Sequence, residues 1–327
     1  MERFSIRFSL KLFFLATLCL CLASPSWAQP DGFSQSENDE FLIPVQITPS
    51  AGKECLTPVQ KIALEEEEPL TSERKIPSEK REFLTRGEKT LLLNAGSMAV
   101  IFMYGLSQWD YGKDGFHFAN ERWFQRDTHY GGADKLGHFW SSYALSHLYS
   151  YVYRKWGYSE KEANLYGAVS SLGVQTFMEV ADGFSSQGFS YEDLIMNVAG
   201  AGVGYVWGKV PYLAKKIDFR IEYTPGFDSK DFGFSTNYER QRFLIALKAD
   251  GFNFLKNPCL RYLEFHAGYY TRHYKDYEGG SPDDRRRHLY IGIGFNVSKL
   301  VQKFVNTKVL DYFQIPYTSA GKGFPLD

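Results

Sequence analysis

The sequence contains few cysteines and has no surplus of charge of either sign. Four cysteines among 327 residues are too few for a fold held together mainly by disulfides. The 37 Lys and Arg residues nearly cancel the 38 Asp and Glu residues, so the chain lacks the one-sided positive field on which many nucleic-acid binders depend. We therefore expect no nucleic-acid partner.

Residues 1–28 have the features of a secretory signal peptide. Basic residues precede and flank an apolar run, 12–23, that is too short for a comfortable membrane span. Small residues near its end predict cleavage after Ala28. No small residue stands directly before Cys19 or Cys21, so the sequence favours cleavage over lipidation. The chain is therefore expected to be exported to the periplasm or the outer membrane.

The next segment, residues 29–88, has the composition of a disordered linker. It contains six prolines and the acidic run 65–68, and it has too little apolar surface to offset the entropy of ordering. Cleavage of the signal leaves Cys55 in this linker and Cys259 near the far end of the chain. An exported compartment permits a disulfide between them, and two unpaired thiols are the equal alternative.

Two different hydrophobic patterns follow the linker. Residues 89–215 contain four helix-length segments with little or no formal charge, at 90–109, 136–153, 163–181 and 194–207. From 216 to 327 apolar residues alternate with polar ones, as in Leu289 to Val297, which is the period of a β-strand. These patterns predict an α+β fold, in which a four-helix bundle of apolar helices is followed by an antiparallel β region of four to six strands.

The lengths of the apolar segments raise the alternative of a multi-pass inner-membrane protein. After a cleaved signal, the connection 154–162 would face the outside and 182–192 would face the cytoplasm. The outer connection carries three basic residues and the inner one none, which is opposite to the positive-inside rule. We therefore favour a bundle outside the inner membrane.

Polar and charged residues gather at the ends of the predicted helices. Short connections make the second, third and fourth helices antiparallel, so the start of the second, the end of the third and the start of the fourth should meet at one pole. The residues at these ends are Asp134, Lys135, His138, Glu179, Asp182, Asp193 and Asn197. In the fourth helix, a stripe of glycines at Gly200, Gly204 and Gly208 would let another helix approach closely.

Three interpretations of this pole are open. The residues could form a purely structural network of ion pairs and helix caps. They could bind an anionic or amphipathic ligand through Lys135, His138 and the helix N-termini. They could also hold a metal ion or supply acid–base groups, because one histidine with three carboxylates suits a hard or borderline cation. The sequence identifies neither the metal nor any other cofactor.

The spacing of these residues resembles that of a known family. The run Asp134-Lys135-x-x-His138, the pair Glu179-x-x-Asp182 and the run Asp193-x-x-x-Asn197-x-x-Gly200 resemble the YfiM-like family of periplasmic lipoproteins, and more distantly the VanZ-like membrane proteins. The resemblance covers about residues 88–210. It implies a location in the cell envelope and a shared polar site, but no activity.

Together these features predict an exported envelope protein with a non-enzymatic binding or structural role. The expected partner is an envelope lipid, glycan or protein, and the expected location includes association with a membrane. The alternative is a metal-dependent or His/carboxylate-dependent hydrolase that acts on a lipid or lipid-phosphate substrate.

Overall fold

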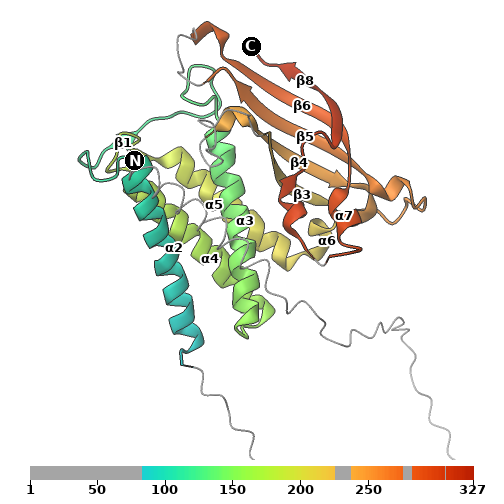
Figure 1. Cartoon of the computed structure of the whole chain (residues 1–327), viewed down its shortest axis with the longest axis horizontal. Helices are drawn as coiled ribbons and strands as arrows, with labels where there is room; N and C mark the ends of the chain where they lie inside the picture. Colours follow the sequence, from blue (N-terminus) through green and yellow to red (C-terminus); the bar gives the residue numbers. More distant parts are fainter. Residues whose placement is uncertain (1–82, 225–236, 275–281, 306) are drawn as a thin grey trace, which may run out of the picture. The chain divides into compact units, whose positions relative to one another are not determined.

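The computed structural model describes residues 83–224, 237–274, 282–305 and 307–327. The predicted signal peptide and nearly all of the predicted linker, with Cys55, lie outside these residues, so the proposed disulfide remains a prediction. Cys259 is exposed. The described part of the chain has an α+β fold in which helices precede a sheet (Figure 1).

Four long helices match the predicted apolar segments, and three of them extend a few residues beyond the segment at each end, while the first begins earlier and ends at Gln108. The described helices are α2 (Arg86–Gln108), α3 (Ala133–Lys155), α4 (Glu160–Asp182), α5 (Tyr191–Lys209), the short α6 (Pro211–Ala214) and α7 (Val297–Val301). Thr85 and Ser159 cap α2 and α4 in capping boxes. The side-chain oxygen of each accepts a hydrogen bond from the backbone amide of a glutamate three residues later, and its own backbone amide donates to the carboxylate of that glutamate. Helices α2 and α4 therefore begin where local polar groups satisfy their free amides.

A glycine with positive φ sets the start of α3. Gly132 has φ +83°, and a Cβ at this position would clash with Phe124. This left-handed turn needs glycine and directs the chain from an irregular loop into α3. It thereby fixes the position of the first turn of α3, which carries Asp134 and Lys135.

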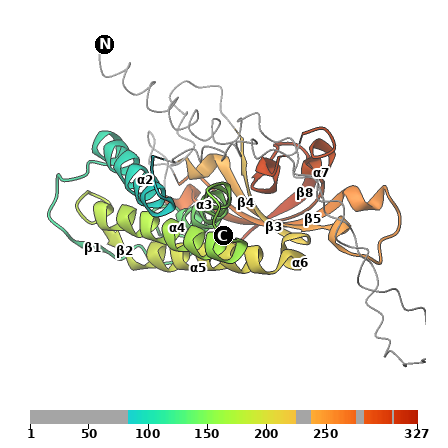
Figure 2. The same cartoon turned by 90° about the horizontal axis from the view of Figure 1, so that it is seen from below.

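The regular four-helix bundle predicted above is not confirmed. Helices α3, α4 and α5 pack against one another, while α2 packs chiefly on α4. Helix α3 also contacts β3, β4 and β5, so it lies between the other helices and the sheet (Figure 2). The helices therefore form a layer that packs on one side of the sheet.

Six strands form the main sheet, in the order β7-β3-β4-β5-β6-β8. Their bounds are β3 (Ile217–Tyr223), β4 (Gln241–Lys248), β5 (Leu263–Arg272), β6 (Arg286–Phe295), β7 (Phe313–Gln314) and β8 (Ser319–Pro325). Two short segments, β1 (Phe118–Ala119) and β2 (Phe189–Ser190), pair separately in parallel. The prediction of antiparallel pairing alone is wrong at one edge, because β7 pairs with β3 in parallel.

The two faces of the main sheet differ sharply in polarity. Cross-strand pairing places Asp218, Arg220 and Glu264 on one face, where they are buried and joined by ion pairs. The other face is apolar. Helix α3 covers part of it, where Phe219 packs against Phe139 and Ala133 packs against Ile221 and Phe243. Most of this apolar face is therefore open along β4, β5, β6 and β8.

Candidate functional site

The structure brings the seven predicted polar residues together where three helix ends meet. Asp134, Lys135 and His138 lie in the first turns of α3, Glu179 and Asp182 in the last turn of α4, and Asp193 and Asn197 in the first turns of α5. We call these seven residues, with Glu121 and Tyr111, the polar cluster. Most of its members are buried, so their charges interact away from bulk water.

Lys135 lies at one side of the polar cluster and is almost completely buried. Its Nζ atom is 2.8 Å from Asp134 Oδ2 and 2.9 Å from Asp193 Oδ1, and it also donates to Glu121. Burial alone would lower the pKa of Lys135, but the three carboxylates outweigh it and raise this pKa well above its usual range. The ammonium group is therefore fully occupied by protein carboxylates.

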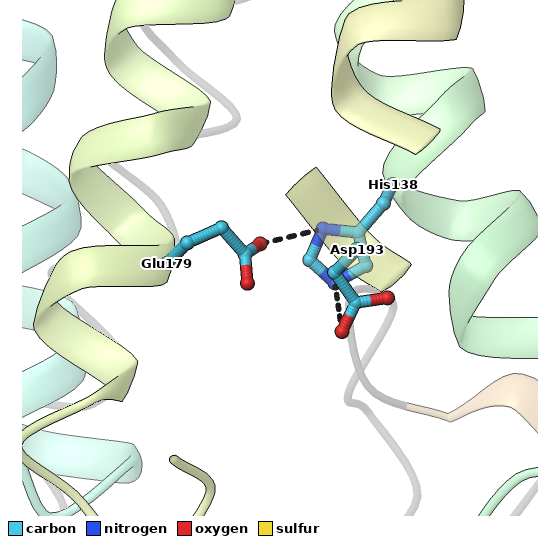
Figure 3. Close-up of side chains that lie close together, drawn as sticks. All are labelled: His138, Glu179 and Asp193. Carbon is cyan, nitrogen blue, oxygen red and sulfur yellow. Dashed lines mark ion pairs between the residues drawn. The ribbon is translucent and has the colours of Figure 1, made fainter. Parts of the chain in front are cut away.

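His138 lies between carboxylates from two other helices. Its Nδ1 atom is 3.0 Å from Glu179 Oε1 and its Nε2 atom is 3.8 Å from Asp193 Oδ2 (Figure 3). Burial alone would lower the pKa of His138, but Asp193 and Glu179 outweigh it and raise the pKa to about 10. In the structure as it stands, His138 is therefore a charged imidazolium at neutral pH.

Neutral polar groups hold Glu179 in place. Asn197 Nδ2 donates to Glu179 Oε1 at 3.1 Å, and Asn197 Oδ1 accepts from Ser142 Oγ at 2.9 Å. This chain of hydrogen bonds joins α5, α4 and α3 within the buried interior. These hydrogen bonds restrict rotation of the Glu179 side chain and keep its carboxylate directed toward His138.

The glycine stripe of α5 permits this close approach. A Cβ at Gly200 would clash with the carbonyl oxygen of Phe139, and one at Gly204 would clash with Ser146 Oγ, both in α3. A Cβ at Gly208 would clash with the side chain of Asn164 in α4. The stripe thus faces both neighbouring helices, and its lack of side chains lets the three helices pack closely.

Two members of the polar cluster were missed by sequence reasoning. Glu121 lies in the irregular loop before α3, where no periodicity predicts which residues turn inward. Burial, and next Asp193, raise its pKa. Tyr111 follows α2, and burial with the nearby Asp182 raises its pKa well above the usual range. The sequence offered no sign of Tyr111, and the one sign of Glu121 was its proximity in sequence to the first turn of α3.

The polar cluster has more carboxyl groups than cationic ones. Five carboxyl groups, those of Glu121, Asp134, Glu179, Asp182 and Asp193, face one ammonium and one imidazole group. Burial, and next Glu179, raise the pKa of Asp182 to about 7. Such a site attracts a cation or protons. The interpretation as an anion site is disfavoured, because Lys135 and His138 already pair with these carboxylates.

Two groups of side chains in the cluster have the composition of a metal site. In each, the potential ligand atoms lie within 4.8 Å of one another. One group is Glu121, Asp134 and Asp193, and the ammonium of Lys135 already occupies the space among them. The other is His138, Glu179 and Asp193, drawn in Figure 3. This second group has no lysine between its members and is the better candidate for a cation.

Fold and site thus define a helical domain that has a polar interior and is followed in the sequence by a sheet. Residues 120–209 match the model of DUF2279, a family described as a predicted periplasmic lipoprotein. The YfiM-like resemblance fits this match, which spans α3, α4 and α5 and every member of the polar cluster except Tyr111. The family description supports an exported protein of the periplasm or outer membrane. No curated protein and no solved structure matches the chain.

Proposed function

We propose that this chain is an envelope protein that binds a divalent cation through His138, Glu179 and Asp193. The observation that carries the proposal is the surplus of buried carboxyl groups around one histidine, at a point where three helix ends are held together. Carboxylates and imidazole together suit a hard or borderline cation.

The geometry needs only a small change to accept such an ion. Ligands at roughly 2.0–2.2 Å from a zinc ion would lie about 3.5 Å from one another, and the present ligand atoms lie within 4.8 Å of one another. His138 would give up its proton to become a ligand, and Asn197 would keep Glu179 oriented. A bound cation would join α3, α4 and α5 directly.

An aromatic group beside the polar cluster indicates what the cation-loaded pole would bind. Phe116, Phe118, Phe184 and Phe189 contact one another, and the first three are exposed. Phe184 lies two residues after Asp182, so the aromatic group and the polar cluster meet at the end of α4. Apolar rings next to a cation suit an amphipathic envelope ligand with an anionic head group, such as a lipid.

The cation proposal is tested by measuring metal binding with purified protein. We expect the protein to bind zinc, manganese or calcium in calorimetric titrations, and we expect His138→Gln to weaken the affinity at least about tenfold, as loss of one ligand should. The exposed His129 offers the matched control, because His129→Gln should change nothing. Absence of binding to the folded wild-type protein would leave a structural ion-pair network as the role of the cluster.

A hydrolase of lipid or lipid-phosphate substrates is the second candidate. The observation that favours it is Asp182, whose pKa of about 7 suits a group that exchanges a proton near neutral pH. Metal-loaded protein incubated with phospholipid or a lipid phosphate would release a product, and Asp182→Asn would abolish release while retaining metal binding. Metal binding without product release would support the binding role alone.

A further inference from the structure

The open apolar face of the main sheet is a feature that the polar cluster does not explain. We define the sheet face by its exposed apolar residues on four adjacent strands: Ile245, Leu247, Leu263, Phe265, Leu289, Ile291, Ile293, Phe295 and Phe324. Pairing aligns them in rows across the strands, as in Leu247, Phe265 and Ile293. One cationic side chain, Lys322, shares these rows, opposite Ile291.

The opposite face of the sheet carries polar residues that are buried, because successive residues of each strand point to opposite faces. There, β3, β4 and β5 carry Arg220, Lys248, Glu264 and His266, all buried. Arg220 Nη1 is 2.8 Å from Glu264 Oε2, and Lys248 Nζ is 2.6 Å from Asp218 Oδ1. A sheet in water normally buries its apolar face and exposes its polar one. This sheet does the reverse along most of its width, so its exposed face is expected to be covered by something apolar.

One end of the sheet face carries aromatic and basic side chains. Phe295 stacks on Tyr262 at a ring distance of 5.5 Å, and the Nζ atoms of Lys299 and Lys303 lie 5.2 and 5.1 Å from the centre of the Tyr262 ring. Lys299 also pairs with Asp250 at 3.1 Å. Apolar surface that continues into aromatic rings and lysines has the chemistry of a contact with lipid chains and anionic head groups.

We propose that the sheet face docks on a bilayer that contains anionic phospholipid, with Tyr262, Lys299 and Lys303 at the level of the head groups. Charge distinguishes this face from the exposed apolar surface on the outer side of α4. That surface ends in Glu160, Lys161 and Glu162, a mixture of signs with no preference for an anionic membrane. The proposal is independent of cation binding at the polar cluster.

Sedimentation with vesicles tests the docking, using the chain without its predicted signal peptide, residues 1–28. Wild-type protein should bind vesicles of phosphatidylcholine with phosphatidylglycerol, and Ile291→Ser with Ile293→Ser should weaken binding about tenfold or more. The matched control is Leu165→Ser with Val169→Ser on α4. Exposures of 48% and 60% on the sheet match 45% and 59% on the helix. Equal loss in both variants, or loss only in the helix variant, overturns the proposal.

The contribution of the basic end is tested with the same vesicles. Lys299→Gln with Lys303→Gln should weaken binding to the mixed vesicles by about fivefold or more, because each lysine near an anionic surface contributes modestly. Binding to vesicles of phosphatidylcholine alone should be weaker and unaffected by this change. The control, Lys161→Gln with Lys209→Gln, should have no effect. Binding that ignores both lipid charge and Lys299 and Lys303 would contradict the proposed head-group contact.

Two further measurements cover the remaining outcomes. Amide hydrogen exchange of the unmodified protein should slow in β6 and β8 when vesicles are added, and unchanged exchange there overturns the proposal even if the serine variants fail to fold. Sedimentation velocity without vesicles identifies a competing occupant. A stable dimer that is disrupted by Ile291→Ser with Ile293→Ser would mean that a second copy of the chain covers the face instead.

Discussion

His138 Nδ1 lies 3.0 Å from Oε1 of Glu179, although 41 residues separate them in the chain. The contact joins the first turns of α3 to the last turn of α4, and Asn197 of α5 holds the same carboxylate. Both side chains are largely buried, with 14% of His138 and 2% of Glu179 exposed. The pair is therefore both a candidate ligand set and a contribution to stability, and these two roles respond differently to pH.

The stability contributed by His138 should fall as the pH rises. Its pKa is about 10 in the folded protein and 6.5 ordinarily, so the contribution is complete below about pH 6.5 and is lost as the pH approaches 10. We expect His138→Gln to lower the free energy of unfolding by roughly 2–4 kcal/mol at pH 6. Urea unfolding at pH 6 and at pH 10 measures this difference, which should nearly vanish at the higher pH. A difference independent of pH would show that His138 is not charged.

Charged Asp182 should destabilise the fold, whereas charged His138 stabilises it. Its pKa of about 7 lies above the ordinary 3.8, so the folded state holds this proton more tightly and the carboxylate destabilises the fold as the pH rises from about 4 to 7. Asp182→Asn removes that charge and should raise the free energy of unfolding by roughly 1–2 kcal/mol at pH 8, but not at pH 4. The exposed Asp114 provides the control, Asp114→Asn, which should change neither value.

The sequence predicted the helices and the meeting of their ends well, for a physical reason. Long uncharged segments joined by short polar connections predict antiparallel helices. This antiparallel order is enough to place His138, Glu179 and Asp193 at the same end of the helices. The same reasoning could not identify Glu121, because its loop has no period and only the turn at Gly132 decides its position.

The sheet was harder to predict because alternation does not say which face is covered. The pattern in β6 predicts that Ile291 and Ile293 share a face, and in most sheets that face would be the interior. Here Arg220 and Glu264 occupy the interior side. The parallel edge strand β7 and its neighbour in sequence, β8, lack a strong alternating pattern, since β7 has two residues and β8 contains Gly321 and Gly323.

Loss of Lys135 should be costly, and a divalent cation should partly compensate. Lys135→Met leaves Glu121, Asp134 and Asp193 facing one another without their shared cation, which should lower the free energy of unfolding by roughly 3–5 kcal/mol. Calcium or magnesium could then occupy the vacated space between oxygen ligands. Thermal unfolding of Lys135→Met should therefore shift upward with added calcium by more than that of the wild-type protein, and equal shifts would contradict this interpretation.

The glycines of α5 provide a test of whether close helix packing creates the polar cluster. Gly200→Ala would place a methyl group against the carbonyl of Phe139, and the resulting displacement of α3 should cost roughly 1–3 kcal/mol. Gly202 lies in the same helix, but a Cβ there meets nothing within 4 Å. Gly202→Ala should therefore stabilise the helix by roughly 0.5–1 kcal/mol. Chemical denaturation of the two variants measures both effects. If Gly200→Ala also weakens cation binding while Gly202→Ala does not, the distance between α3 and α5 sets the geometry of His138, Glu179 and Asp193.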